Sequence, residues 1–444
     1  MYEPYLGAFN LASRLKLLLI LEALFYGLSS ALTTGLLFVY IVSIGAGIEG
    51  ISAVVGISAI VKLLVHLIIY KYPRILVTKV RMSFILNHFI DRILFIFIPL
   101  TQNYMIIGLI YAAAAATPTT AFMNLVIFGS LSKNDIKDIT AKRTATLGVS
   151  SIIGYAISIF LLAFMPPETK FFYIYLLGGV IGLLATTVVG FMHLSHLNGM
   201  KIPEGIKQPE RIFSTSAYFV AILAGGNLFS MVWIPYVMDH LKGPDYLAVT
   251  MNLVITLTSV LASLVCKGWS FKRLRYNVGL DAASPILALA TPIPIIHPML
   301  SAFSSFAYTA SNFIGSFLFA NYNKWLGAIK SSILIVIIIC VANVLIAPMS
   351  AIVKGNYFLL FLIVFGIKLI AFIIALTTIP EVAAVPEQTA RTYSFLLYNK
   401  SFTGYRVSVE ISRDTILLTL RLIGLAVVLS TLYVIYRILL FIVF

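Results

Sequence analysis

Long apolar segments recur along the whole chain, and they constrain its fold more than any other feature. Each runs for about 20 residues with few charges, the length that a helix needs to cross a hydrocarbon core of about 30 Å. Hydrophobic residues make up 60% of the chain and charged residues only 11%, whereas about a quarter of a soluble domain is charged. The sequence therefore predicts an all-α integral membrane protein. The thirteen predicted membrane helices lie at about 17–42, 51–70, 82–100, 104–130, 146–165, 171–196, 213–238, 246–266, 277–296, 299–321, 331–349, 356–379 and 415–440.

Motifs that would indicate an enzyme, a metal site or a removable leader do not occur. Cys266 and Cys340 lie in different helices without paired spacing, so no disulfide framework and no thiolate metal site is expected. His193 and His196 could share a metal, but no third ligand stands nearby. The G-x-x-x-x-G-K-[ST], HExxH and GxSxG motifs are absent. Glu3 and the lack of a small-residue cleavage site indicate that the first helix is retained. We expect a protein that is not an enzyme and has no metal or cofactor.

Basic residues concentrate in the amino terminus and in alternate loops. Through helix twelve the odd-numbered loops carry only Lys170, Lys242 and Lys354. This asymmetry predicts a multi-pass protein of the cell (plasma) membrane with a cytoplasmic amino terminus. Because the basic residues are scattered among short loops, the net charge of +15 indicates topology and not a nucleic-acid partner. The basic residues on the predicted cytoplasmic side are Arg14, Lys16, Lys71, Arg74, Lys79, Arg81, Lys133, Lys137, Lys142, Arg143, Lys201, Lys207, Arg211, Lys267, Lys272, Arg273, Arg275, Lys324 and Lys330.

The two parts of the chain repeat each other. The first helix near Leu17 corresponds to the seventh near Phe213, and the basic loop from Lys71 corresponds to the one from Lys267, both with an offset of 196 residues. This offset predicts two six-helix halves in the same orientation. The predicted division is an amino-terminal half at 1–196, a cytoplasmic linker at 197–212, a carboxyl-terminal half at 213–380, a cytoplasmic segment at 381–414 and an extra helix at 415–444.

The extra segment contains Arg421 and Arg437. Both could reach opposite interfaces from a spanning helix, or the segment could lie along the membrane surface.

This architecture resembles the major facilitator superfamily over about residues 10–380. The resemblance rests on twelve helices in two parallel repeats, cytoplasmic ends of that core, a cytoplasmic linker, and basic loops after the second and eighth helices. Those loops read KYPRILVTKVR and CKGWSFKRLR. They keep the basic residues of the family's motif but lack its acid, and the first loop also lacks its glycine. The resemblance implies a secondary transporter with a substrate cavity between the halves.

The segment NHFIDRILFIFIPL places an acid and a base side by side inside the third helix. A charge near the centre of a membrane helix costs roughly 2.5 to 3.5 kcal/mol, so Asp91 and Arg92 each need a partner. Asp91 lies about ten residues into its helix, or roughly 15 Å deep, and Lys62 lies at a similar depth on helix two. We predict a network of Glu22, Lys62, His88, Asp91 and Arg92, with Lys62 paired to Asp91 and Glu22 to Arg92, because neighbours on a helix point in different directions. The network either holds the helices together or also carries a proton.

Two further charges lie in the carboxyl-terminal half. Asp281 is expected to pair with the basic loop that precedes its helix. Lys368 has no evident acidic partner at its depth, so it is either a cation of the cavity or a side chain that reaches the membrane surface.

The family resemblance implies that helices one, four, seven and ten line the substrate cavity. Their polar and aromatic side chains suit a small polar organic solute, which needs hydrogen-bond partners and a stacking surface. The same residue types are also common at contacts between membrane helices. The candidates are Glu22, Tyr26, Thr34, Thr117, Thr120, Asn124, Asn227, Trp233, Tyr236, Tyr308 and Asn312.

The sequence favours a monomeric secondary active transporter, a symporter or an antiporter, that moves such a solute by alternating access and that protons could drive. The alternative is a flippase for lipid-linked saccharides, in which Lys62, Arg92 and Lys368 would bind a diphosphate head group.

Overall fold

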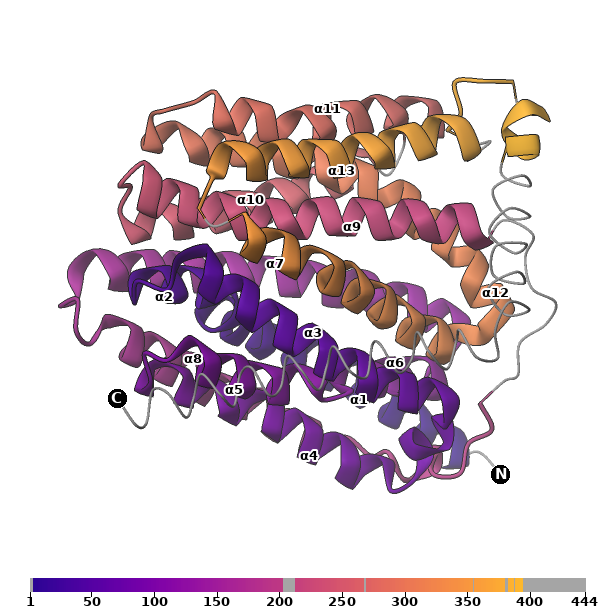
Figure 1. The fold of residues 1–444 in the computed structure, drawn as a ribbon. Coiled ribbons are helices and arrows are strands. Elements are labelled where there is room, and N and C mark those ends of the chain that lie inside the picture. Colours follow the sequence, from indigo (N-terminus) through magenta and orange to yellow (C-terminus); the bar gives the residue numbers. More distant parts are fainter. Residues whose placement is uncertain are drawn as a thin grey trace, which may run out of the picture.

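The computed structural model describes residues 3–202, 212–266, 269–353, 355–379, 382–386 and 388–393. These residues form helices and connecting loops and no strand (Figure 1). The α-helices are α1 (Glu3–Leu32), α2 (Leu37–Ser43), α3 (Gly47–Lys71), α4 (Val80–Ile93), α5 (Tyr104–Ala116), α6 (Thr119–Ser130), α7 (Lys133–Phe164), α8 (Lys170–Gly190), α9 (Ile212–Pro235), α10 (Asp245–Cys266), α11 (Phe271–Leu289), α12 (His297–Ile352) and α13 (Tyr357–Thr378). Short 3-10 or π turns are η1 (Thr34–Leu36), η2 (Pro73–Val77), η3 (Leu94–Leu100), η4 (Ser195–Leu197), η5 (Tyr236–His240) and η6 (Pro294–Ile296).

Twelve of the thirteen predicted membrane segments fall on helices of the described residues. Ten stretches of the described residues are long and apolar enough to cross a membrane. The predicted helices at 277–296 and 299–321 correspond to α11 and to the first part of α12. Several helices start at a polar cap: the side chains of Asn103, Ser132 and Asn356 accept backbone N–H bonds at the first turns of α5, α7 and α13. The all-α membrane fold with a twelve-helix core is confirmed, whereas the predicted extra helix at 415–444 lies outside the described residues.

Two predicted membrane helices are interrupted, and two others run together. The first breaks at Thr33 into α1 and α2, and the fourth breaks at Thr117 and Pro118 into α5 and α6, where proline cannot supply the backbone N–H of a continuous helix. In α12 two membrane helices run together across Gly327, whose φ of 73° and ψ of 162° turn the chain sharply. A left-handed φ is available to glycine at little steric cost, so one residue replaces a loop between helices ten and eleven.

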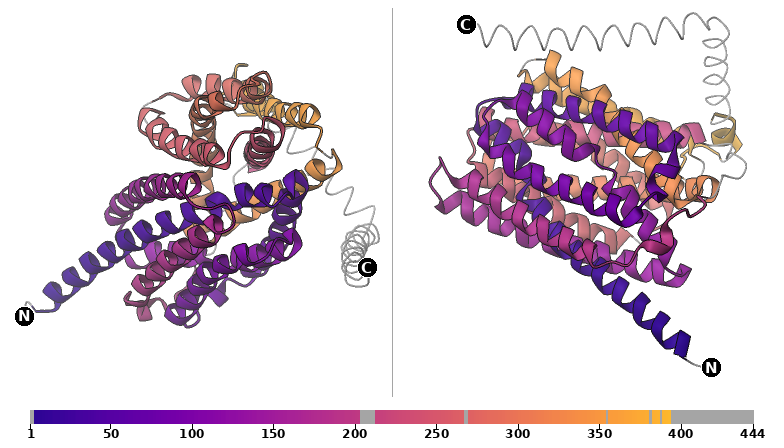
Figure 2. Two further views of the ribbon diagram at one scale, coloured as in Figure 1. Left: turned by 90° about the vertical axis from the view of Figure 1, so that its left-hand side faces the viewer. Right: turned by 90° about the horizontal axis from the view of Figure 1, so that it is seen from below.

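The helices form two bundles that lie side by side (Figure 2). In the amino-terminal bundle α1 packs on α7 and α8, α3 on α5, and α4 on α8. In the carboxyl-terminal bundle α9 packs on α12 and α13, and α11 packs on the same two helices. Contacts of α3 with α12 and of α7 with α10 join the bundles.

The helices run between two ends of the molecule, which we name by their loops. The basic end holds the loops at 72–79 and 191–202 and the turn at Gly327. The far end holds the loops at 44–46, 101–103, 165–169 and 241–244, and residues 353 and 355–356. In Figure 1 the basic end is on the right, with the amino terminus, and the far end is on the left, with α2.

The apolar core is divided unequally between these ends. One cluster joins far-end residues of the amino-terminal bundle, such as Leu36 and Tyr175, to the core of the carboxyl-terminal bundle. A second cluster fills the basic end of the amino-terminal bundle and takes only Ile329 and Ile333 as buried members from α12. The two bundles therefore share one continuous core at the far end.

Candidate functional site

A buried charge cluster joins four helices of the amino-terminal bundle. The Glu22 side chain on α1 is 2% exposed, and its Oε2 accepts hydrogen bonds from Arg143 Nη2 at 2.7 Å and Nε at 3.3 Å on α7. Its Oε1 lies 3.4 Å from Nε2 of His88 on α4. The other ring nitrogen of His88 lies 2.8 Å from the Thr186 hydroxyl on α8. Because the Arg143 side chain is 17% exposed, the cluster is not fully sealed from solvent.

The acid and base of α4 bind each other. Arg92 Nη2 lies 3.1 Å from Asp91 Oδ2, and the guanidinium carbon lies 4.2 Å from the centre of the Tyr26 ring, within cation–π range. Arg92 is 4% exposed and the Asp91 side chain 18% exposed. The predicted Glu22–Arg92 pair is therefore wrong. Although the two Cβ atoms point in different directions, the long arginine side chain folds back to its neighbour.

The predicted Lys62–Asp91 pair is also wrong, because α3 faces other helices. Its main neighbours are α5 and α12, and α4 packs chiefly on α8. Ser52 of α3 bonds Ser350 of α12 at 2.6 Å, and further along α3 the half-buried Lys62 lies within electrostatic reach of Cys340. Within the described residues no carboxylate lies at ion-pair distance from Lys62. It lies instead along the contact between the two bundles.

The carboxyl-terminal bundle contains a separate, sealed ion pair. Lys368 Nζ on α13 donates to Asp281 Oδ1 on α11 at 2.6 Å and to the Ser284 hydroxyl at 3.2 Å. The same ammonium lies 4.6 Å from the centre of the Phe229 ring on α9. Lys368 is 1% exposed and Asp281 is fully buried. Lys368 therefore has a partner, and the expected pairing of Asp281 with the basic loop is wrong.

The start of α11 explains why the sequence did not predict this pair. The helix begins at Phe271, six residues before the predicted start, with Ser270 as its N-cap residue. Asp281 is then ten residues into the helix, or roughly 15 Å deep at about 1.5 Å per residue. Lys368 is eleven residues into the 22-residue α13, so the two depths match.

The Glu22–Arg143 contact was missed for a similar reason. The sequence places Arg143 in a basic loop, but α7 begins at Lys133 and carries Arg143 into the bundle. The motif SKND at 132–135 signals this earlier start. Ser132 Oγ accepts from the Asp135 N–H at 3.3 Å, as the first residue of a capping box does, and it also donates to the Asp135 carboxylate at 2.8 Å.

The remaining cavity candidates occupy varied environments. Trp233 and Tyr236 are each 3% exposed, and each donates a hydrogen bond: Trp233 Nε1 to His297 Nδ1 at 2.8 Å and the Tyr236 hydroxyl to the Leu289 carbonyl at 3.3 Å. Asn227 donates to Asn343 Oδ1 at 2.7 Å. The Thr117 hydroxyl donates to the Ala114 carbonyl at 2.7 Å. The half-buried candidates are Tyr26, Thr117, Asn124, Asn227, Tyr308 and Asn312, and the exposed ones are Thr34 and Thr120.

Two buried oxygen atoms of the carboxyl-terminal bundle lack a hydrogen-bond partner. They are Asp281 Oδ2 and the side-chain oxygen of Asn312. Tyr308, one turn before Asn312 on α12, lies within electrostatic reach of Asp281. Buried polar atoms usually have partners, so these acceptors have hydrogen-bonding capacity that the described side chains do not use.

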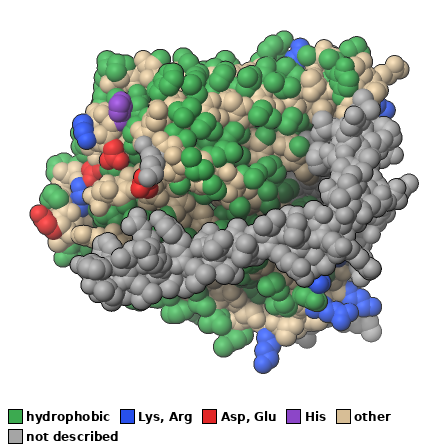
Figure 3. Space-filling model, viewed as in Figure 1, with side chains coloured by type: hydrophobic (Ala, Val, Ile, Leu, Met, Phe, Trp, Pro, Cys, Tyr) green, Lys and Arg blue, Asp and Glu red, His purple; other side chains and the backbone are tan. Residues whose placement is uncertain are grey.

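Polar contacts between the bundles occur in the far-end half of the described residues. Besides the Ser52–Ser350 bond, Asn252 of α10 donates to the Gly35 carbonyl at 2.9 Å, and Lys170 of α8 forms an ion pair with Asp245 of α10. Figure 3 shows that the acidic side chains visible on one face gather at this end. Together with the shared apolar core, these bonds hold the far end together.

Comparison with known proteins gives matches in structure. No family model matches the chain, and no curated protein matches it in sequence. The nucleoside transporter NupG matches with a TM-score of 0.57 and 13% identity, covering 82% of this chain and 98% of that one, and a mutant of NupG matches with a TM-score of 0.59 over the same shares. A bacterial homologue of the human lysosomal transporter Spinster, in an inward-facing and occupied conformation, matches with a TM-score of 0.59 and 12% identity, covering 82% and 96%. At these identities the similarity shows the fold.

Proposed function

The chain has the fold of the major facilitator superfamily, and from this premise we propose that it is a secondary active transporter for a small polar organic solute. The observation that carries this proposal is the way in which the two bundles contact each other. The bundles touch along α3–α12 and α7–α10, and they are bonded to each other at the far end. Movement of one bundle against the other would expose a site between them to one end at a time.

The predicted orientation makes the basic end cytoplasmic. To open the far end, the protein has to break the Ser52–Ser350 and Asn252–Gly35 bonds and the Lys170–Asp245 ion pair. At the basic end α12 contributes mainly apolar contacts through Ile329 and Ile333. We propose that these two sets of contacts form and break alternately during transport, and that the protein works as a monomer in the cell membrane.

We propose Glu22 as the group that couples transport to protons. Its charge is held by Arg143, whose helix α7 packs on α10 of the other bundle. Protonation of Glu22 would remove the negative charge and weaken this bond, because hydrogen bonds to an ionised acceptor are about twice as strong as neutral ones. Weakening of this bond would leave Arg143 without a charged partner close to the contact between the bundles. Asp281 is a weaker candidate, since its ion pair is sealed.

Transport by reconstituted protein tests this proposal. The full chain in proteoliposomes is given an imposed pH gradient and a panel of polar solutes that starts with nucleosides, because NupG is described as a nucleoside transporter. We expect gradient-dependent flux in the wild type, gradient-independent flux in Glu22→Gln, and wild-type behaviour in Asp138→Asn, a control carboxylate that is 50% exposed on α7. Wild-type flux that ignores the gradient would contradict proton coupling, and an absence of flux across the panel would contradict the proposed substrate class.

The structure gives less support to a saccharide-lipid flippase. That function needs cations that are open to a diphosphate group, but Lys368 and Arg92 are buried against Asp281 and Asp91. Of the three predicted cations only Lys62 has no carboxylate partner among the described residues. Saturable binding of a polyprenyl diphosphate, lost in Lys62→Gln, would favour the flippase over the transporter.

A further inference from the structure

Five cations among the described residues line a large hollow at the basic end. It has a volume of about 1220 Å³ and lies between the end of α3, the η2 loop, the loop after α8 and the part of α12 that follows Gly327. Lys71, Arg74, Lys79 and Lys201 come from the amino-terminal bundle and Lys330 comes from α12. No acidic residue is among the described residues that line the hollow.

The walls of this basic hollow are held in place by hydrogen bonds between its loops. The Val80 N–H donates to Asn198 Oδ1 at 2.8 Å, and the Gly199 N–H donates to the Val77 carbonyl at 2.9 Å. Lys79 has a φ of 48°, which places a non-glycine residue in the left-handed region. Such a conformation is uncommon and persists where the surrounding structure enforces it. The loops therefore present their cations in a fixed arrangement.

The five cations lack carboxylate partners in the part of the chain that the structure describes. Elsewhere at the basic end, Lys16 binds Asp135 and Lys142 binds Asp138. In the basic hollow, by contrast, the contact recorded for Lys71 is the ring of Tyr72, 5.4 Å away. Like charges gathered in one concavity repel each other and raise the local concentration of anions.

Because Lys330 comes from α12, the basic hollow is lined by cations from both bundles. Lys330 is half-buried, and the adjacent Ile329 is packed in the core of the amino-terminal bundle. Lys330 therefore faces four cations of the other bundle across the hollow, and their repulsion opposes closure of this end. An anion bound among them would attract both sides.

We propose that the basic hollow binds an anion with two or more phosphate charges and that the bound anion holds the two bundles together at the basic end. Lysine and arginine are the usual protein ligands for phosphate. The position at the ends of membrane helices suits a phosphorylated lipid head group as well as a soluble polyphosphate. This inference does not rest on the identity of a transported solute.

Binding to the purified full-length chain tests the proposal. One arm titrates inorganic pyrophosphate into protein in phosphatidylcholine nanodiscs. The other arm compares the thermal unfolding midpoint in nanodiscs that contain or lack phosphatidic acid. Each arm uses the wild type, the K71Q/K79Q/K330Q variant, and a matched control, R14Q/K142Q/R273Q, which removes three exposed cations outside the basic hollow.

We expect saturable binding in at least one arm, a loss of affinity of about tenfold or more in K71Q/K79Q/K330Q, and a much smaller loss in the control. Pyrophosphate binding identifies a soluble anion as sufficient, and a shift with phosphatidic acid alone identifies a lipid head group. No binding in either arm, or equal losses in both triple variants, would overturn the site. A dissociation constant unchanged in K330Q would overturn the bridging of the two bundles.

Discussion

The two buried ion clusters show how similar charges serve different purposes in the two bundles. In the carboxyl-terminal bundle Lys368 and Asp281 are sealed, and an aromatic ring covers the ammonium. In the amino-terminal bundle Glu22 is buried, but its partner Arg143 is 17% exposed and lies on a helix that packs against the other bundle. Solvent reaches the cluster around Glu22 through Arg143, whereas it does not reach the sealed pair. The sealed pair is therefore suited to holding α11 against α13, and the open cluster is the one that we propose for coupling.

The largest effect should come from breaking the sealed pair. Lys368→Met leaves the Asp281 carboxylate buried without its cation, and loss of one partner of a buried pair costs about 3 to 5 kcal/mol. Unfolding of the purified protein in detergent would show a large drop in thermal midpoint. In the double variant Lys368→Met/Asp281→Leu much of that stability should return, since no unpaired charge remains. A double variant as unstable as the single would mean that the cost arises from packing and not from charge.

A smaller loss of stability is expected when the open cluster is broken. In Glu22→Gln the amide still accepts a hydrogen bond, and Arg143 can reach solvent, so we expect a cost of about 1.5 to 3 kcal/mol, the range for a hydrogen bond to a charged group. The same unfolding assay measures it. If this variant were destabilised more than Lys368→Met, the distinction between an open and a sealed cluster would fail.

Two glycines extend the comparison of the two clusters, because each lies against the aliphatic carbons of a buried cationic side chain. A Cβ at Gly225 would lie 2.7 Å from Lys368 Cγ, and a Cβ at Gly182 would lie 2.8 Å from Arg92 Cδ. Overpacking of this kind costs about 1 to 3 kcal/mol. We expect Gly225→Ala to lower the thermal midpoint by at least as much as Gly182→Ala, because Lys368 is held between Asp281 and Phe229. Gly366→Ala, where an added Cβ meets open space, is the control.

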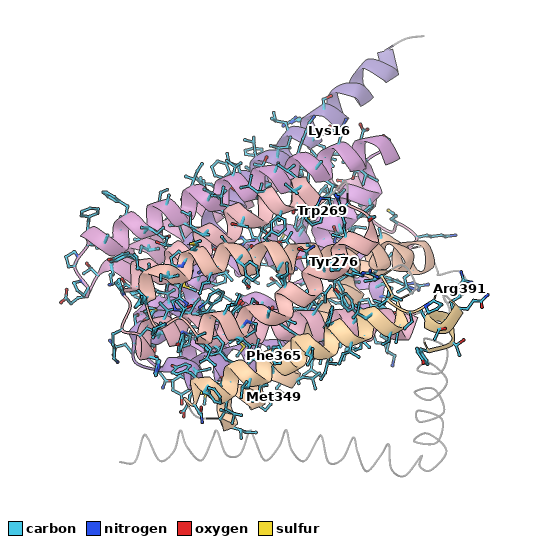
Figure 4. The ribbon with its side chains drawn as sticks, turned by 90° about the horizontal axis from the view of Figure 1, so that it is seen from above. Lys16, Trp269, Tyr276, Met349, Phe365 and Arg391 are labelled. Atoms are coloured by element: carbon cyan, nitrogen blue, oxygen red, sulfur yellow. The ribbon has the colours of Figure 1, made fainter. Side chains whose placement is uncertain are left out.

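The smallest effect should appear at a half-buried contact between α1 and α7, the two helices that Glu22 and Arg143 also join. Lys16 donates to Asp135 at 2.5 Å, and in Figure 4 Lys16 lies where α1 leaves the bundle. The hydrogen bond from Lys16 holds the pKa of Asp135 below its ordinary value. A carboxyl whose pKa is lowered by folding stabilises the protein above its unfolded pKa of about 3.9 and loses that contribution as the pH falls through the folded value.

The corresponding experiment compares wild type with Asp135→Asn over a pH series. The wild type should have a slightly higher thermal midpoint near neutral pH. The difference should shrink as the pH falls below about 4 and vanish below the lowered folded pKa of Asp135. A difference that persists in acid would show that the carboxylate charge is not the cause.

The sequence predicted the fold correctly because hydrophobic length is a local property. Segments of about 20 apolar residues can satisfy their backbone groups in a bilayer only as helices, and the offset of 196 residues between corresponding features predicted two repeated bundles. The break at Pro118 also has a local cause, since proline lacks the backbone N–H that a helix uses, although Pro285 and Pro348 lie inside α11 and α12. Among the site residues, the sequence singled out the intramembrane charges, and the structure buries Glu22, His88 and Arg92.

The partners of those charges were decided by the tertiary structure. Depth along a helix is fixed by the sequence once the helix start is known. The predicted starts of α7 and α11, at 146 and 277, lie 13 and 6 residues after the observed starts, and these errors hid the Glu22–Arg143 and Lys368–Asp281 pairs. Rotation of a helix about its axis and its choice of neighbour are set by packing over the whole bundle. Lys62 and Asp91 lie at similar depths, yet α3 packs on α12 and α4 packs on α8. The sequence by itself determined which segments span the membrane and which charges need partners, and only the packing of the helices decided which partners they found.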